Sequence, residues 1–266
     1  MLIQRTSRIF PVTHLLLFCI LLAALFVAGQ AMPVYFGAFH YLSVGVFVSV
    51  GLLFLTDFWV KREGTTLETL GLRWREHIMS QSFIGLFAGL SVMAIIYVVV
   101  WLSTDTEIKV LPETVLSSFL LKAVPTLLAL ALMEELAFRG YLLFKLRQLL
   151  NTRVAIYATA IVFGLYHGLV IESLIGPAVW GLIFALLAFW SRGLAMPTMF
   201  HFALNFAQAI FDSKPKYTPG LYEFVISDEA TANLVYQVGL AIQGGILVIA
   251  IVLIEVYCRK ENGLSR

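Results

Sequence analysis

Charged side chains and cysteines are both scarce in this chain of 266 residues. Only 13% of the residues are charged, whereas a soluble domain carries about a quarter. The 18 Lys and Arg are nearly balanced by 16 Asp and Glu, which argues against the strongly basic surface of a nucleic-acid-binding protein. The two cysteines, Cys19 and Cys258, lie in or beside apolar runs, which excludes a disulfide scaffold. Soluble, nucleic-acid-binding and disulfide-rich classes are all disfavoured.

Hydrophobic sequence is abundant instead, at 60% of the residues. A helix needs roughly 20 apolar residues to cross a bilayer core about 30 Å thick. No internal repeat, low-complexity tract or linker divides the chain. The sequence therefore predicts an all-α polytopic bundle, one membrane domain over residues 1–266. Its transmembrane helices, about eight in number, are expected at residues 12–32, 38–58, 79–102, 115–148, 153–171, 175–191, 195–212 and 234–257.

The distribution of basic residues predicts the orientation in the membrane. Lys and Arg gather in cytoplasmic loops, and placing both termini in the cytoplasm puts most of them on that side. Arg5 and Arg8 precede a first apolar run that is rather long for a signal peptide, so we expect an uncleaved first span. The opposite side then keeps only Lys109, Lys122, Lys214 and Lys216.

Most charged residues lie near the ends of predicted helices. There Asp57 can pair with Lys61, and Glu255 with Arg259, each four residues apart on one helix. The run 115–148 is different, because its apolar sequence ends in several charges. It is too long and too charged at that end to lie wholly in lipid.

Glu134 and Glu135 are the unusual acids of this run. An acid in a transmembrane helix costs at least about 2.5 kcal/mol and usually faces a partner or a wet cavity. Glu135 and Arg139 are four residues apart and can neutralise each other. Glu134 points about 100° away from Glu135 on an ideal helix. It either marks the cytoplasmic interface or faces a functional partner.

His167 is the candidate partner on the next helix. Residues 134 and 167 are equidistant from the turn near residues 150–152, so an antiparallel hairpin places Glu134 and His167 at the same height. On the seventh run, His201 and Asn205 are four residues apart and share one helical face at a compatible depth. These groups form either a site or an unrelated set of hydrogen-bonded core residues.

A buried carboxylate beside an imidazole can hold a water and take its proton, and His201 with Asn205 can donate hydrogen bonds to an oxyanion. This chemistry hydrolyses a carbonyl compound, most simply a peptide bond. A zinc site of Glu134, His167 and His201 is an alternative. The sequence has no H-E-x-x-H helix, and Asn205 is a poor zinc ligand. We therefore favour a mechanism without a cofactor and keep Zn²⁺ as the alternative.

Three motifs carry a resemblance: Glu134-Glu135-x-x-x-Arg139, Phe163-x-x-x-His167 and His201-x-x-x-Asn205. In order, on three predicted helices, they resemble the signature motifs of the CPBP family. These are the CAAX proteases and bacteriocin-processing enzymes, also called Abi, which include the type II CAAX prenyl endopeptidases. The resemblance covers residues 115–212, which we take as the catalytic helices.

The resemblance implies an integral-membrane endopeptidase of about eight helices with a cavity open toward the cytoplasm. It implies that Glu134 and His167 activate water, that His201 and Asn205 stabilise the oxyanion, and that Glu135, Arg139 and Phe163 support the site. The implied substrate is a membrane-associated protein or peptide, either a prenylated CAAX protein or a bacterial peptide or C-terminal sorting signal. The small size favours the inner membrane of a bacterium.

Two other functions remain open. One is a non-catalytic immunity or scaffold protein with the same fold, in which loss of the acid leaves the function intact. The other is a small transporter whose Glu134 and His167 relay protons. A transporter would need polar residues along the outer half of a pathway, and the sequence shows few.

Overall fold

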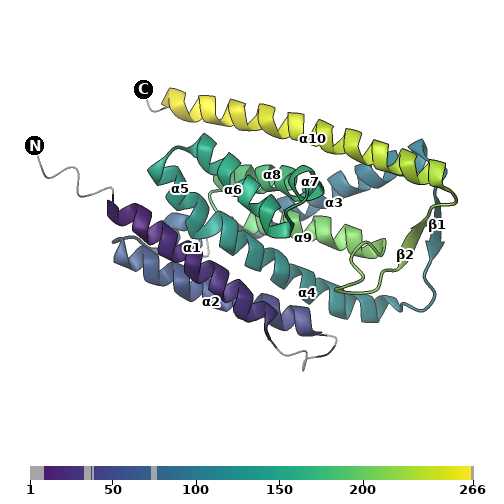
Figure 1. Cartoon of the computed structure of the whole chain (residues 1–266), viewed down its shortest axis with the longest axis horizontal. Coiled ribbons are helices and arrows are strands. Elements are labelled where there is room, and N and C mark those ends of the chain that lie inside the picture. The colour runs from purple at the N-terminus through teal and green to yellow at the C-terminus, as the bar shows by residue number, and fades with distance from the viewer. Residues whose placement is uncertain (1–8, 33–36, 38, 73–76, 265–266) are drawn as a thin grey trace, which may run out of the picture.

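The computed structural model describes residues 9–32, 37, 39–72 and 77–264, and these form helices that pack side by side with one small two-stranded sheet (Figure 1). The predicted all-α membrane bundle is confirmed. The helices are α1 (Ile9–Gln30), α2 (His40–Arg62), α3 (Ile78–Ser103), α4 (Leu116–Ala137), α5 (Leu143–Leu149), α6 (Thr152–His167), α7 (Ile171–Ile175), α8 (Pro177–Ser191), α9 (Ala195–Ile210) and α10 (Glu229–Leu264). Strands β1 (Glu107–Val110) and β2 (Tyr222–Val225) pair antiparallel.

Helix length separates two groups within the bundle. Five helices of the described chain are long and apolar enough to cross a membrane, at residues 12–30, 40–62, 78–103, 116–149 and 229–261. Helices α6, α8 and α9 have only 16, 15 and 16 residues. At 1.5 Å per residue each reaches roughly 24 Å or less, short of a 30 Å core. The predicted spans 153–171, 175–191 and 195–212 therefore correspond to short helices, and eight full crossings are not established.

The fourth predicted span contains a break. Helix α4 ends at Ala137, a wide turn with π-type hydrogen bonding covers Phe138–Leu142, and α5 follows. Gly140 leaves the helical conformation there, with φ −74° and ψ −120°. Such wide turns redirect the side chains around them and are frequent at functional sites. Arg139 lies within this turn and is fully buried.

Helices α3 and α9 pack closely against each other. Gly85 and Gly89, four residues apart on α3, face the backbone of α9. A methyl group at Gly89 would come within 2.7 Å of the Phe200 carbonyl oxygen. Small residues at this spacing allow membrane helices to pack backbone against backbone. The contact fixes the depth of α9, which carries His201.

The start of α1 and the end of α10 lie at one end of the bundle, and the two-stranded β1–β2 sheet lies at the other (Figure 1). The first end also holds the ion pairs of Lys145 with Glu63 and of Arg147 with Glu261. We call it the basic end. This arrangement agrees with an even number of crossings, and the cytoplasmic placement of this end remains a prediction from the basic residues.

Candidate active site

Three helices bring one acid and two imidazoles together. Glu134 lies in the last turn of α4, His167 ends α6, and His201 lies near the middle of α9. The Nε2 atom of His167 is 3.8 Å from Glu134 Oε2, and that of His201 is 3.7 Å from the same oxygen. The structure thus places Glu134 and His167 at one height, and His201 joins them.

The outer nitrogen of each ring fixes how the ring faces Glu134. His167 Nδ1 lies 2.9 Å from the Phe163 carbonyl oxygen, which can only accept, so Nδ1 carries a proton. His201 Nδ1 donates to Glu135 Oε1 at 3.0 Å. Both rings therefore turn Nε2 toward Glu134 Oε2. That oxygen is buried and has no hydrogen-bond partner among the residues that the structure describes.

Glu135 accepts the hydrogen bonds that hold Arg139 and the His201 ring in place. Its side chain is fully buried, and Oε1 accepts from Arg139 Nη1 at 3.1 Å as well as from His201. Arg139 Nη2 donates to the Gly181 carbonyl oxygen at 3.1 Å. A buried ion pair offsets its desolvation only with such additional hydrogen bonds. Glu135 and Arg139 therefore hold the His201 ring and link α4, α8 and α9.

Aromatic rings enclose this ion pair. The guanidinium of Arg139 lies 4.4 Å from the ring centre of Phe163 and 5.1 Å from that of Phe184. Phe184 also stacks on His201, with ring centres 4.4 Å apart, and Phe163 meets His167 edge-on at 4.6 Å. The rings exclude water from the pair and limit the motion of both imidazoles.

Two of these contacts come from a helix that the sequence analysis did not single out. Gly181 and Phe184 lie on α8, whose sequence from Pro177 to Ser191 is almost wholly apolar. A methyl group at Gly181 would lie 3.2 Å from Arg139 Nη2, so a larger residue there would crowd the guanidinium. No charge or motif marks either residue, and the sequence offered no signal for them.

Asn205 lies one turn beyond His201 on α9 and is partly exposed. Residues four apart share a helical face, so its amide is on the side of α9 that carries His201. This position suits a second hydrogen-bond donor to a substrate bound beside Glu134.

The accessible side of the site lies where α6 ends. The His167 side chain is 32% exposed, compared with 7% for His201. Gly168 has a φ of 155°, which lets the chain leave the helix directly after the histidine. The next residue, Leu169, is 88% exposed. A substrate can therefore approach His167 from the apolar surface around this helix end.

The loop after α9 adds two titratable groups near Glu134. Burial lowers the pKa of Lys214, and the charge of Glu134 opposes that effect. Burial also raises the pKa of Tyr217, and Glu134 adds to the rise. The two side chains are close enough to interact with the charge of Glu134, although no sequence pattern connects them with it.

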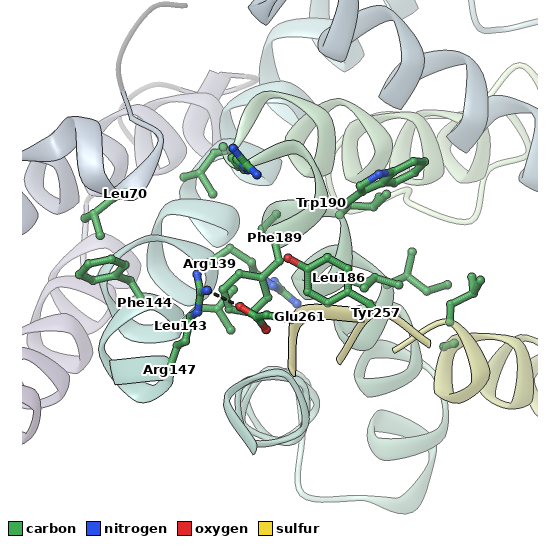
Figure 2. A pocket seen from close by; sticks show the side chains of 18 of the residues that line it. Leu70, Arg139, Leu143, Phe144, Arg147, Leu186, Phe189, Trp190, Tyr257 and Glu261 are labelled. Atoms are coloured by element: carbon green, nitrogen blue, oxygen red, sulfur yellow. Dashed lines mark hydrogen bonds and ion pairs between the residues drawn. The ribbon is translucent and has the colours of Figure 1, made fainter. Parts of the chain in front are cut away.

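A separate cavity of about 940 Å³ opens at the basic end (Figure 2). Arg139 belongs to its lining, but Glu134, His167 and His201 do not. This cavity lies behind the Glu135–Arg139 pair rather than around Glu134. The cavity toward the cytoplasm that the family resemblance implies stays a prediction.

Within the described ranges, no group of three or more His, Cys, Asp or Glu side chains is placed to hold a metal ion. The zinc ligand set Glu134, His167 and His201 does not meet that geometry as arranged here. We therefore derive no chemical step through a metal.

A comparison with known protein families finds a match over the central helices. Residues 116–207, roughly a third of the chain, match the family described as "Type II CAAX prenyl endopeptidase Rce1-like". The matched segment contains all the predicted site residues, from Glu134 to Asn205. The family resemblance of the three motifs is thereby confirmed. The comparison with curated proteins gives no match.

Proposed function

We propose that this membrane protein is a CAAX-type intramembrane endopeptidase in which Glu134 activates the attacking water. The observation that supports this most directly is the convergence of two imidazole Nε2 atoms, 3.7 and 3.8 Å away, on one buried carboxylate oxygen. A buried acid with no hydrogen-bond partner of its own costs stability and persists where it has a task.

The first step is attack on the peptide carbonyl. Glu134 Oε2 takes a proton from water, and the water oxygen forms a bond to the carbonyl carbon as the carbonyl π electrons move to its oxygen. With Nδ1–H engaged by Phe163, neutral His167 offers Nε2 as an acceptor for the second water hydrogen. Glu134 and His167 thus align one water between them.

The second step is collapse of the tetrahedral intermediate. The C–N bond breaks, and Glu134 returns its proton to the leaving amine. Until then the oxyanion needs donors, which His201 Nε2–H and the Asn205 amide supply. His201 can donate from Nε2 while Nδ1 bonds Glu135 only if the ring carries both protons. That second proton also balances the charge, because Glu134 and Glu135 outnumber Arg139 by one.

The substrate in this proposal is a membrane-associated protein or peptide. The exposed apolar residues beside His167 favour a substrate that arrives within or along the bilayer. A prenylated CAAX protein and a bacterial C-terminal sorting signal both satisfy this requirement.

The test compares the C-termini of membrane proteins, by mass spectrometry, between cells with the native chain and cells with Glu134→Gln, His167→Ala or His201→Ala. Each variant should eliminate the same set of cleavage products while the protein accumulates in the membrane. Glu107→Gln and His77→Ala, both exposed and away from the site, are the controls and should leave the products intact. Unchanged products in Glu134→Gln would reject the protease and favour an immunity or scaffold function.

A separate measurement tests whether the reaction needs zinc. Elemental analysis of the purified protein should show no stoichiometric zinc. Its activity should not fall after treatment with a chelator. Zinc at one ion per chain that leaves together with activity would establish the metalloprotease alternative.

A further inference from the structure

The cavity at the basic end has the composition of a lipid site and plays no part in the proposed reaction. It lies between the end of α5, the end of α8 and the last turns of α10, and it has a volume of about 940 Å³ (Figure 2). Pockets of roughly 300–1,000 Å³ hold small organic ligands.

The walls of the cavity are apolar and continue onto the lipid-facing surface. Leu253 and Val256 of α10 line it and are about half exposed, and the buried Leu186 of α8 also lines it. Trp190 is 67% exposed at its edge and is labelled there in Figure 2. Tryptophan is enriched where a membrane meets water, so the mouth lies at that level.

The mouth carries basic side chains. Arg147, Arg192 and Lys260 line it together with Glu68 and Glu261. Arg147 pairs with Glu261, as the dashed line in Figure 2 marks. Within the described part of the chain, Arg192 and Lys260 form no ion pair, and both are exposed. The side chains of Arg192 and Lys260 thus place two positive charges, without an ion-pair partner among the described residues, at the mouth of an apolar cavity.

We propose that this cavity binds one anionic phospholipid from the leaflet at the basic end. Its phosphate lies between Arg192 and Lys260, and an acyl chain follows the wall formed by Leu186 and Leu253. Basic pockets between transmembrane helices bind acidic lipid head groups in this way. A free phosphate would contact only the cations at the mouth, whereas a membrane lipid contacts both these cations and the apolar walls.

A peptide substrate in its reacting position fits this cavity poorly. The fully buried Arg139 forms part of the lining, and its pair with Glu135 lies between the cavity and His201. A scissile bond held here would be separated from Glu134 by that layer. The lipid site is therefore independent of the proposed protease function.

The test is native mass spectrometry of the full chain in detergent, titrated with phosphatidylglycerol and, separately, with phosphatidylcholine of the same acyl chains. The native protein should retain one phosphatidylglycerol at concentrations where phosphatidylcholine does not bind. Lys260→Gln should weaken phosphatidylglycerol binding about fivefold, because a basic residue near a membrane surface contributes about that factor to binding of acidic lipid. Arg192→Asn should do the same, and asparagine tolerates the left-handed backbone at this position.

Matched controls separate the cavity from general charge. Arg259→Gln removes a positive charge from an exposed position that neighbours Lys260 and does not line the cavity. It should leave lipid binding unchanged. For the wall, Leu253→Trp should fill the cavity and lower occupancy, whereas Val252→Trp, beside it on the lipid-facing side, should not.

Four outcomes would overturn the proposal. They are equal binding of phosphatidylcholine, equal losses in Arg259→Gln and Lys260→Gln, full competition by soluble glycerol phosphate, and displacement of the lipid by a prenylated peptide. The last two would assign the cavity to a soluble phosphate or to a lipidated peptide. Because both glutamine variants change exposed side chains, each is expected to fold, and a thermal melt checks this.

Discussion

Glu63 and Glu134 are two largely buried acids of this bundle, 12% and 14% exposed, with opposite surroundings. Glu63 Oε1 accepts from Tyr141 Oη and Lys145 Nζ, each at 2.7 Å, at the basic end. Glu134 Oε2 has no hydrogen-bond partner in the described chain and faces two imidazole nitrogens beyond hydrogen-bond distance. The satisfied acid stabilises the fold by joining α2 to the α4–α5 segment. The unsatisfied acid costs stability and is available to a water.

The largest effect expected from this contrast is on the reaction. Glu134→Gln should lower kcat about 10²–10⁴-fold, the usual contribution of a general base. The melting temperature should stay the same or rise, because a neutral amide is cheaper to bury than a carboxylate without a partner. Cleavage rates and thermal melts of the purified protein check both parts. A large fall in melting temperature would show that Glu134 serves the fold instead.

The next effect is on stability. Arg139→Met leaves Glu135 as an unpaired buried charge and should cost about 3–5 kcal/mol of unfolding free energy. Arg147→Met is the control, since its pair with Glu261 is largely exposed and worth at most about 1 kcal/mol. Denaturation of both variants in detergent measures the difference. Equal losses would mean that burial does not distinguish the two pairs.

Glu63→Gln should destabilise the protein by about 2 kcal/mol, because it removes hydrogen bonds to a charged acceptor. Its kcat should remain near the native value, in contrast to that of Glu134→Gln. Thermal unfolding and a cleavage assay on the same preparation make the comparison direct. A loss of kcat with unchanged stability would contradict the structural role of Glu63.

The pH dependence of stability follows from the same residue. Burial alone would raise the pKa of Glu63, but hydrogen bonds from Lys145 and Tyr141 and the Lys145 charge lower it overall. A lowered pKa gives stability that is present above the unfolded value of about 4.3 and lost as the pH falls through the folded value. Native protein should therefore lose stability below about pH 4, and Glu63→Gln should lose less there.

The smallest expected effect is at Gly181. Gly181→Ala places a methyl group 3.2 Å from Arg139 Nη2 and should cost about 1 kcal/mol through crowding. Gly244→Ala on α10 meets nothing within 4 Å and should be neutral or stabilising by about 1 kcal/mol. Melting temperatures of the two variants test whether the close approach of α8 matters.

The site could be predicted from the sequence because polar residues inside apolar runs are few. Glu134, His167 and His201 stood out for that reason, and the equal distances of Glu134 and His167 from the turn placed them at one height. Gly181 and Phe184 could not be found this way, because their roles depend on helix packing and their own helix carries no polar signal.

The element boundaries were harder, because hydrophobicity alone does not show where a helix ends. The apolar run 153–171 continues past His167, but the helix stops there because Gly168 adopts a positive φ. The predicted pair of Asp57 with Lys61 is present, whereas Glu255 pairs with Arg153 of α6 rather than with Arg259. Local spacing cannot reveal a partner on another helix.

The shared oxygen of Glu135 has a consequence for how the protein enters the membrane during synthesis. Glu135 and Arg139 lie on one continuous segment and can neutralise each other as soon as it leaves the ribosome. Gly181 and His201 are translated later and complete the cluster from α8 and α9. The arginine of this segment therefore has a partner encoded four residues earlier in the same segment, and α8 and α9 add the remaining contacts to the pair. Glu134 is translated before His167 and His201, so its carboxylate reaches the membrane before either imidazole is available to face it.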